Sequence, residues 1–424
     1  MKKHFRSQFL RSLAILTSGS FLAQVIIVIC SPIMTRLYST EQIGEYTLVL
    51  TAVGLFGSVI CARYDMAIVA EEDEKKVISL AALSLLISIV LSIIVSIGYS
   101  IYYLYKGYTV RQILFCCFCI LILLVLVGLG NILISYNNRC KEYKLMTSVN
   151  LIRAVAKQGI MIIGGLTWPT AWILIISEIG GTIFGVKRQS ESLMKKTDHF
   201  KDFKKVTWNN LIEVGVKHKK QALFSTPALF ANNFSYSSIN LFIVDIFGKS
   251  TLGLYSVSYR LLGLPLTLIS TNVSRLYFEE AARQFEKEGH YDKILIRTTL
   301  IMIAISIPMT AVLMLMAPQF CSVFFGKEYY TAGIYLRYLA PMFGVRFIVS
   351  PISVGMIISQ KQQYELIFQI GFVIMSLISY VATRLFDWSI DYYLVLISCL
   401  YSLVYIVFYI ALIKISKEKE IQND

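Results

Sequence analysis

Residues 78–105 read ISLAALSLLISIVLSIIVSIGYSIYYLY, a run of 28 residues without a charged side chain. About 20 apolar residues are enough for a helix to cross a hydrocarbon core of about 30 Å. The run is continuous and lacks the alternation of two residues that is typical of barrel strands. It therefore predicts a transmembrane helix.

The same signal recurs along the whole chain. Of the 424 residues, 56% are hydrophobic and 16% are charged, whereas about 25% of the residues of a soluble domain are charged. Hydrophobic segments indicate twelve spans, near 13–35, 43–66, 78–105, 112–136, 146–166, 169–187, 221–246, 251–276, 294–317, 331–358, 364–385 and 392–413. We expect an all-α integral membrane protein. The first segment is long and contains Gln24, which favours a retained span over a cleaved signal peptide.

The net charge of +14 reports topology rather than a nucleic-acid partner. Basic residues concentrate in alternate loops, above all in 188–220, while the other set of loops holds Arg36, Lys106, Arg111, Lys249, Lys327 and Arg384. The positive-inside rule then places both termini and the 188–220 loop in the cytoplasm.

A short internal repeat predicts two similar halves. A shift of 209 residues superimposes Gly44 on Gly253 and Tyr46 on Tyr255, at the turn after the first span of each half. Because each half holds six spans, both begin on the same side, and the repeat is parallel. The expected lobes are 1–187 and 221–424, joined by a cytoplasmic linker at 188–220, with a central cavity.

Polar residues at helical spacing predict which faces line that cavity. The first span carries Gln24 on a stripe with Thr17, Ser31 and Thr35, and the seventh carries Asn233, Ser237 and Asn240. A polar side chain on a span must face protein or water. Interhelical hydrogen bonds in a dry bundle remain an alternative explanation.

Charged residues inside the spans are the sharpest candidates, because each is costly at mid-membrane. Arg260, Arg346, Arg153 and Lys157 are therefore candidate ligands of an anionic substrate. Glu178 lies in the sixth span, and a hairpin turning at residues 167–168 places it level with Lys157. The pair is either a structural ion pair or a protonatable group that couples transport to an ion gradient, and both interpretations stay open.

Nothing in the sequence indicates catalysis, a metal or another cofactor. The eight cysteines lie almost entirely in apolar segments, the four histidines are scattered, and no nucleophile is paired with a base. We expect a transporter rather than an enzyme.

Several blocks resemble lipid-linked oligosaccharide flippases of the Wzx type, within the multidrug/oligosaccharidyl-lipid/polysaccharide exporter superfamily. The first is PIMTRLYSTEQIGEYTLVLT at 32–51, followed by RYDMAIV at 63–69. The others are the LFSTPALFANNFSYSSINLF block at 223–242 and the FFGKEYYTAGIYLRYLAPMFGVRF block at 324–347. Within RYDMAIV, Asp65 is a second candidate coupling acid and Arg63 a candidate inner gate.

The resemblance implies that the chain moves undecaprenyl-pyrophosphate-linked oligosaccharides from the inner to the outer leaflet of a bacterial plasma membrane. It implies alternating access, a role in capsule, O-antigen or exopolysaccharide synthesis, and a polymerase as a partner in assembly. We expect a monomer in contact with membrane lipid. The alternatives are a drug or metabolite exporter of the same superfamily and, from another class, a membrane polysaccharide polymerase or ligase.

Overall fold

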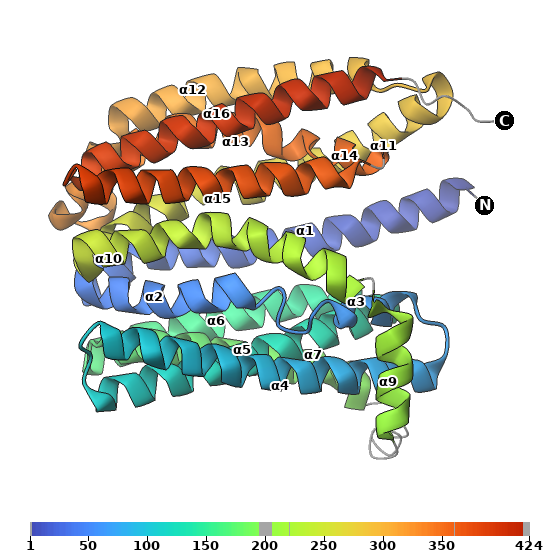
Figure 1. Ribbon diagram of the computed structural model, residues 1–424, viewed down its shortest axis with the longest axis horizontal. Coiled ribbons are helices and arrows are strands. Elements are labelled where there is room, and N and C mark those ends of the chain that lie inside the picture. Colours follow the sequence, from blue (N-terminus) through green and yellow to red (C-terminus); the bar gives the residue numbers. More distant parts are fainter. Residues whose placement is uncertain (1, 195–205, 220, 360, 419–424) are drawn as a thin grey trace. The chain divides into compact units, whose positions relative to one another are not determined.

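The computed structural model describes residues 2–194, 206–219, 221–359 and 361–418, and within these ranges it contains helices and turns but no strands (Figure 1). The chain forms two compact units, Met1–Asn233 and Phe234–Asp424. The predicted all-α class is confirmed.

The first unit is built from long helices and two short ones, α3 and α9. They are α1 (Lys2–Leu37), α2 (Thr40–Phe56), α3 (Tyr64–Ala70), α4 (Glu74–Tyr105), α5 (Val110–Arg139), α6 (Tyr143–Thr167), α7 (Ala171–Met194), α9 (Trp208–Lys217) and the beginning of α10 (Thr226–Pro265), which follows a π-helical turn at Gln221–Ser225. The predicted segment 169–187 is shorter at its end than the helix observed there, since α7 continues to Met194.

The second unit contains the rest of α10 and the helices that follow. They are α11 (Thr271–Glu288), α12 (Asp292–Phe325), α13 (Tyr330–Val349), α14 (Gly355–Ile358), α15 (Gln362–Leu385) and α16 (Ile390–Lys417). The expected span 331–358 lies within one apolar helical segment, Lys327–Ile358, in which a 3-10 turn at Ser350–Ile352 separates α13 from α14. Pro351 lies in that turn and has no amide hydrogen to continue the α-helical ladder.

Nine helical segments among the described residues are long and apolar enough to cross a membrane. One of them, Gln221–Glu288, has 68 residues and must hold more than one span, because a single crossing takes about 20 residues. In helix α4 the distribution of polar and apolar residues is the reverse of that in a helix of a soluble protein. Ser84, Ser88 and Ser92 are buried, while Val90 and Ile94 are exposed. The chain is a multi-pass membrane protein.

The second predicted span, 43–66, is not one helix. It breaks between α2 and α3, where Ala62 and Arg63 adopt the left-handed conformation with φ of 46° and 63°. Side chains of other helices satisfy the carbonyls exposed by the break: Asn131 Nδ2 donates to Gly57 O at 2.9 Å and Asn233 Nδ2 to Leu55 O at 3.4 Å. Non-helical backbone at membrane depth requires such partners.

Helix α10 folds back on itself at Gly248, whose φ of 85° and ψ of 177° are not helical. Tyr236, twelve residues before this turn, and Tyr259, eleven residues after it, both contact Arg346. Two straight segments of about 18 Å each meet one side chain only if the chain reverses between them. The repeat positions Tyr46 and Tyr255 are both buried in their own units.

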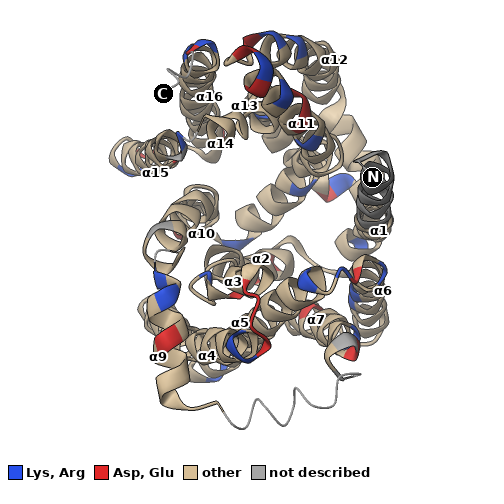
Figure 2. Cartoon of the chain, turned by 90° about the vertical axis from the view of Figure 1, so that its right-hand side faces the viewer, with Lys and Arg blue, Asp and Glu red and all other residues tan. Residues whose placement is uncertain are grey.

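Figure 2 looks at one end of the spans, and charged residues are visible there. In the first unit they include those of α9, and in the second those of α11 and the last turn of α16.

Candidate functional site

A polar cluster inside the first unit centres on Glu178 of α7. Its Oε2 lies 2.5 Å from Lys157 Nζ, and its Oε1 lies 3.6 Å from Arg153 Nη2. Tyr46 of α2 donates its hydroxyl hydrogen to Oε2 at 2.7 Å. Three helices therefore place two cations and a phenol around one carboxylate.

The hairpin of α6 and α7 produces this geometry. Residues 157 and 178 lie at the same distance from its turn, as the sequence predicts, and Gly181 lets the two helices approach closely. A Cβ atom at Gly181 would lie 2.8 Å from the Lys157 Cβ and 2.9 Å from the Arg153 carbonyl oxygen. Real Cβ contacts are not that short, so glycine is required here.

The cluster carries a net charge of +1, because one carboxylate faces two cations. The side chains of Glu178 and Lys157 are 12% and 20% exposed, whereas that of Arg153 is 45% exposed. The surplus charge is therefore presented by Arg153, which also donates to Thr182 Oγ1 at 3.2 Å. Arg153 lines a pocket of about 50 Å³ together with Asn131, Thr182 and Gln189.

Helix α1 borders this region through α6. Asn150 Nδ2 donates to Ser20 Oγ at 3.1 Å, which ties the two helices together. Gln24 lies one turn further along α1 and is half-buried. Ser31 and Thr35, on the same predicted stripe, donate to carbonyls of their own helix.

A second cationic position lies inside the second unit, at Arg346 of α13. Its guanidinium carbon is 4.1 Å from the ring centroid of Tyr236, and Nη1 donates to the Tyr259 hydroxyl at 3.3 Å. Phe343 faces the same guanidinium at 5.6 Å, and the hydroxyls of Tyr236 and Tyr405 share a hydrogen bond. Rings hold this cation from several sides.

No carboxylate among the described residues pairs with Arg346. The aromatic rings offer it quadrupole attraction but no negative charge. The guanidinium is therefore a positive charge oriented by its aromatic surroundings, with a planar set of donors that suits charge-assisted hydrogen bonds.

The other candidates on α10 are half-buried. Arg260 follows Tyr259 on the segment after the turn, and Ser237 and Asn240 lie on the segment before it. Asn233 has a structural partner, since it donates to the Leu55 carbonyl and to the Ser58 hydroxyl at the break in the second span. Its role toward a substrate stays a prediction.

Asp65 and Arg63 lie at the break between α2 and α3. Asp65 is buried in the first turn of α3, and its Oδ1 has no hydrogen-bond partner among the described residues. Arg63 caps that helix in the left-handed conformation and is half-buried. Their predicted roles in coupling and gating remain predictions.

The predicted site does not include the tyrosines. The repeat marks Tyr46 but does not predict its contact with Glu178, and the spacing of polar residues does not predict that Tyr236, Tyr259 and Tyr405 lie around Arg346. Their spacing is a signal that predicts part of this cluster, because Tyr236 and Tyr259 lie at almost equal distances from a turn at Gly248. Within the described part of the chain, no group of three or more His, Cys, Asp or Glu side chains is arranged to hold a metal ion.

Residues 33–333 match the family of polysaccharide biosynthesis proteins. The chain belongs to this family. No curated protein sequence matches it closely enough to serve as a further guide.

Solved transporters share the fold of this polysaccharide biosynthesis protein. The lipid II flippase MurJ in an inward closed conformation is 13% identical with a TM-score of 0.71, and the match covers 95% of this chain and 90% of that one. An inward-facing MATE multidrug resistance transporter of the MOP superfamily is 14% identical with a TM-score of 0.66, covering 94% and 98%. A MOP superfamily transporter from Pyrococcus furiosus is 14% identical with a TM-score of 0.62, covering 96% of each chain.

These similarities show that the polysaccharide biosynthesis protein has the fold of MOP superfamily transporters, with the expected two lobes. At these identities they show the fold and not the substrate.

Proposed function

We propose that the protein is a flippase for undecaprenyl-pyrophosphate-linked oligosaccharide repeat units. It moves them from the cytoplasmic to the outer leaflet of a bacterial plasma membrane by alternating access, with both termini in the cytoplasm. The family supports a role in polysaccharide synthesis, and the fold is that of transporters and flippases.

The observation that carries the proposal is Arg346. It is a cation inside a membrane-spanning unit, held by aromatic rings and without a carboxylate partner among the described residues. Such a group suits a pyrophosphate, because a guanidinium donates in a fork that matches phosphate oxygens. Arg153 provides a similar surplus charge in the first unit.

Export of cationic drugs fits these charges less well. A pocket for cations needs available carboxylates, and in the polar cluster of the first unit the one carboxylate, Glu178, already faces Lys157 and Arg153. We also propose that the oligosaccharide contacts some of the predicted polar and basic residues: Arg153, Lys157, Gln24, Asn233, Ser237, Asn240 and Arg260. The protein works as a monomer beside a polysaccharide polymerase.

Complementation tests the proposal. A strain that lacks this gene should lose surface polysaccharide and accumulate the lipid-linked repeat unit in the inner leaflet, and the wild-type gene should restore export. Arg346→Ala should reduce the affinity for the substrate by about ten- to a hundredfold, from the roughly 1.5–3 kcal/mol of a hydrogen bond to a charged group.

Arg346→Lys should restore export only in part, since the charge remains but the fork is lost. Membrane abundance of every variant must be measured alongside export. Unchanged surface polysaccharide in the deletion strain, or full export by Arg346→Ala at normal abundance, contradicts the proposal.

A further inference from the structure

Helix α9 has two chemically different faces. Trp208, Ile212 and Val216 recur every four residues and form one apolar stripe, while Glu213 and Lys217 form a separate polar stripe about 100° further around the helix. The apolar stripe is not covered by protein, since these three residues are 67%, 50% and 59% exposed.

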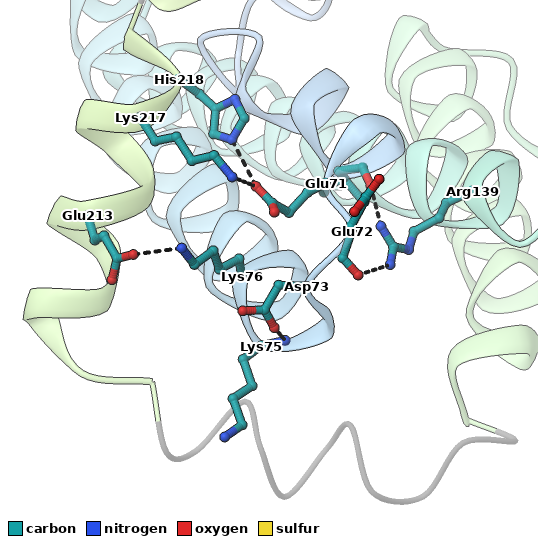
Figure 3. A network of polar contacts seen from close by, with 10 residues as sticks. Glu71, Glu72, Asp73, Lys75, Lys76, Arg139, Glu213, Lys217 and His218 are labelled. Carbon is teal, nitrogen blue, oxygen red and sulfur yellow. Dashed lines mark hydrogen bonds and ion pairs between the residues drawn. The ribbon is translucent and has the colours of Figure 1, made fainter.

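The polar face of α9 is attached to the end of the spans. Lys217 forms an ion pair with Glu71, in the loop between α3 and α4, and His218 Nε2 lies 3.2 Å from the same carboxylate (Figure 3). Lys76 Nζ, in the first turn of α4, lies 2.8 Å from Glu213 Oε1. These contacts fix the rotation of α9 about its own axis.

The apolar face is turned toward deeper parts of the same spans. Gly215 faces Leu83, which a Cβ atom at this position would meet at 3.5 Å, and the Tyr64 hydroxyl donates to the Gly215 carbonyl at 3.2 Å. Leu83 and Ile87 lie seven and eleven residues beyond Lys76, which places them about 10 and 16 Å further along α4. Polar contacts thus lie toward the end of α4 and apolar ones toward its interior.

The helix also crosses the spans instead of running beside them, as Figure 1 shows for α9 and α4. A helix with this orientation, a charged outer face and an uncovered Trp on its inner face is the arrangement of an interfacial helix that lies in the plane of a membrane surface.

Between α9 and α4 lies an apolar groove of about 370 Å³ with one basic residue at its edge. Its walls are formed by Tyr64, Leu83, Ile87, Trp208, Leu211, Ile212, Gly215, Val216 and Lys219. Its size falls within the roughly 300–1,000 Å³ of ligand pockets.

We propose that this groove binds an acidic glycerophospholipid of the leaflet at this end of the spans. An acyl chain lies against Leu83, Ile87 and Trp208, and the phosphate of the headgroup contacts Lys219. The apolar walls select a lipid because they face the hydrocarbon region, and the basic edge at Lys219 selects a negative headgroup. The proposal depends on the fold and not on the substrate that the protein transports.

Quenching of Trp208 fluorescence tests the proposal in the full-length protein. Nanodiscs contain equal amounts of phosphatidylglycerol and phosphatidylcholine, and in parallel samples only one of the two carries brominated acyl chains. Subtracting the emission of Trp208→Phe isolates the signal of Trp208. We expect brominated phosphatidylglycerol to quench it more strongly, because one Lys at an acidic surface enriches the local lipid by about fivefold.

Lys219→Gln should make the two brominated lipids quench equally. Lys75→Gln is the matched control, because Lys75 is exposed at the same end of α4 but does not line the groove, and it should keep the preference. Monodisperse elution of each variant confirms folding.

Absence of quenching by either lipid would show that the apolar face of α9 does not meet the bilayer, and a soluble partner would then be the occupant. Equal quenching in the wild type, or an undiminished preference in Lys219→Gln, would also overturn the proposal.

Discussion

Lys157 and Glu178 face each other across the hairpin of α6 and α7, with 2.5 Å between Nζ and Oε2. Because Arg153 also faces the carboxylate, removing the negative charge leaves two neighbouring cations without an opposite charge. The pair therefore gives a first test of what holds the first unit together.

Glu178→Gln should lower the free energy of unfolding by about 2 kcal/mol or more, because breaking a buried ion pair costs roughly 3–5 kcal/mol and Arg153 can be partly solvated. The double variant Lys157→Gln/Glu178→Gln should recover part of this loss. Thermal unfolding in detergent measures both, with export compared at equal abundance. A fully stable Glu178→Gln that has lost its dependence on an ion gradient would instead identify the pair as the coupling element.

Tyr236 should stabilise the second unit through its ring rather than its hydroxyl. Tyr236→Phe keeps the face that lies against Arg346, whereas Tyr236→Leu removes a cation–π contact worth up to about 2 kcal/mol when desolvated. Unfolding temperature and export should fall clearly more in the Leu variant. Equal effects of the two substitutions would assign the role to the hydrogen bond with Tyr405.

The attachment of α9 should weaken only in strong acid. Hydrogen bonding from Lys217 lowers the pKa of Glu71 from its ordinary value of 4.5 to about 2. A lowered pKa means that the contact contributes fully above pH 4.5 and is lost as the pH falls toward 2. The emission of Trp208, isolated with Trp208→Phe, should be constant from pH 7 to about 4.5 and change below it.

Glu71→Gln should already show the acid spectrum at pH 7. A transition centred near pH 6 in the wild type would mean that Glu71 does not control the attachment.

The left-handed residues in the second span store a conformational cost. A non-glycine residue in this region costs roughly 1–2 kcal/mol, so Ala62→Gly should raise the free energy of unfolding by about 1 kcal/mol. Ala67→Gly, in the interior of α3 where the backbone is helical, should lower it by about 0.5–1 kcal/mol. Differential scanning fluorimetry of both variants measures the change in unfolding temperature. A change of the same sign in the two variants would refute this explanation of the break between α2 and α3.

The spans and one ion pair could be predicted because each depends on a simple rule. Hydrophobic length predicts a helix, and equal distances from a turn predict that Lys157 and Glu178 meet. The break after α2 could not be predicted in this way, because Asn131 and Asn233 satisfy its carbonyls from distant parts of the sequence.

Helix α9 escaped prediction for a different reason. It has only 10 residues and lies in a basic loop, so neither its length nor its mean hydropathy marks it. Its amphipathic spacing was the available signal. The position of Tyr259 beside Arg346 depends on the reversal of the chain at Gly248. Once that turn is known, the rule of equal distances from a turn, which pairs residues 157 and 178, also predicts that Tyr236 and Tyr259 lie level with each other.

The burial of serines along α4 reverses the usual relation between exposure and tolerance to mutation. Val90 and Ile94 are exposed, so lipid contacts them, and one aliphatic residue can replace another there without disturbing a neighbour. Ser88 and Ser92 are fully enclosed, and the Ser92 hydroxyl donates to the Ser88 carbonyl, so a larger residue has no room. Among homologues, we expect the apolar residues on the outer face of this helix to vary in sequence and the small polar residues on its inner face to stay nearly constant.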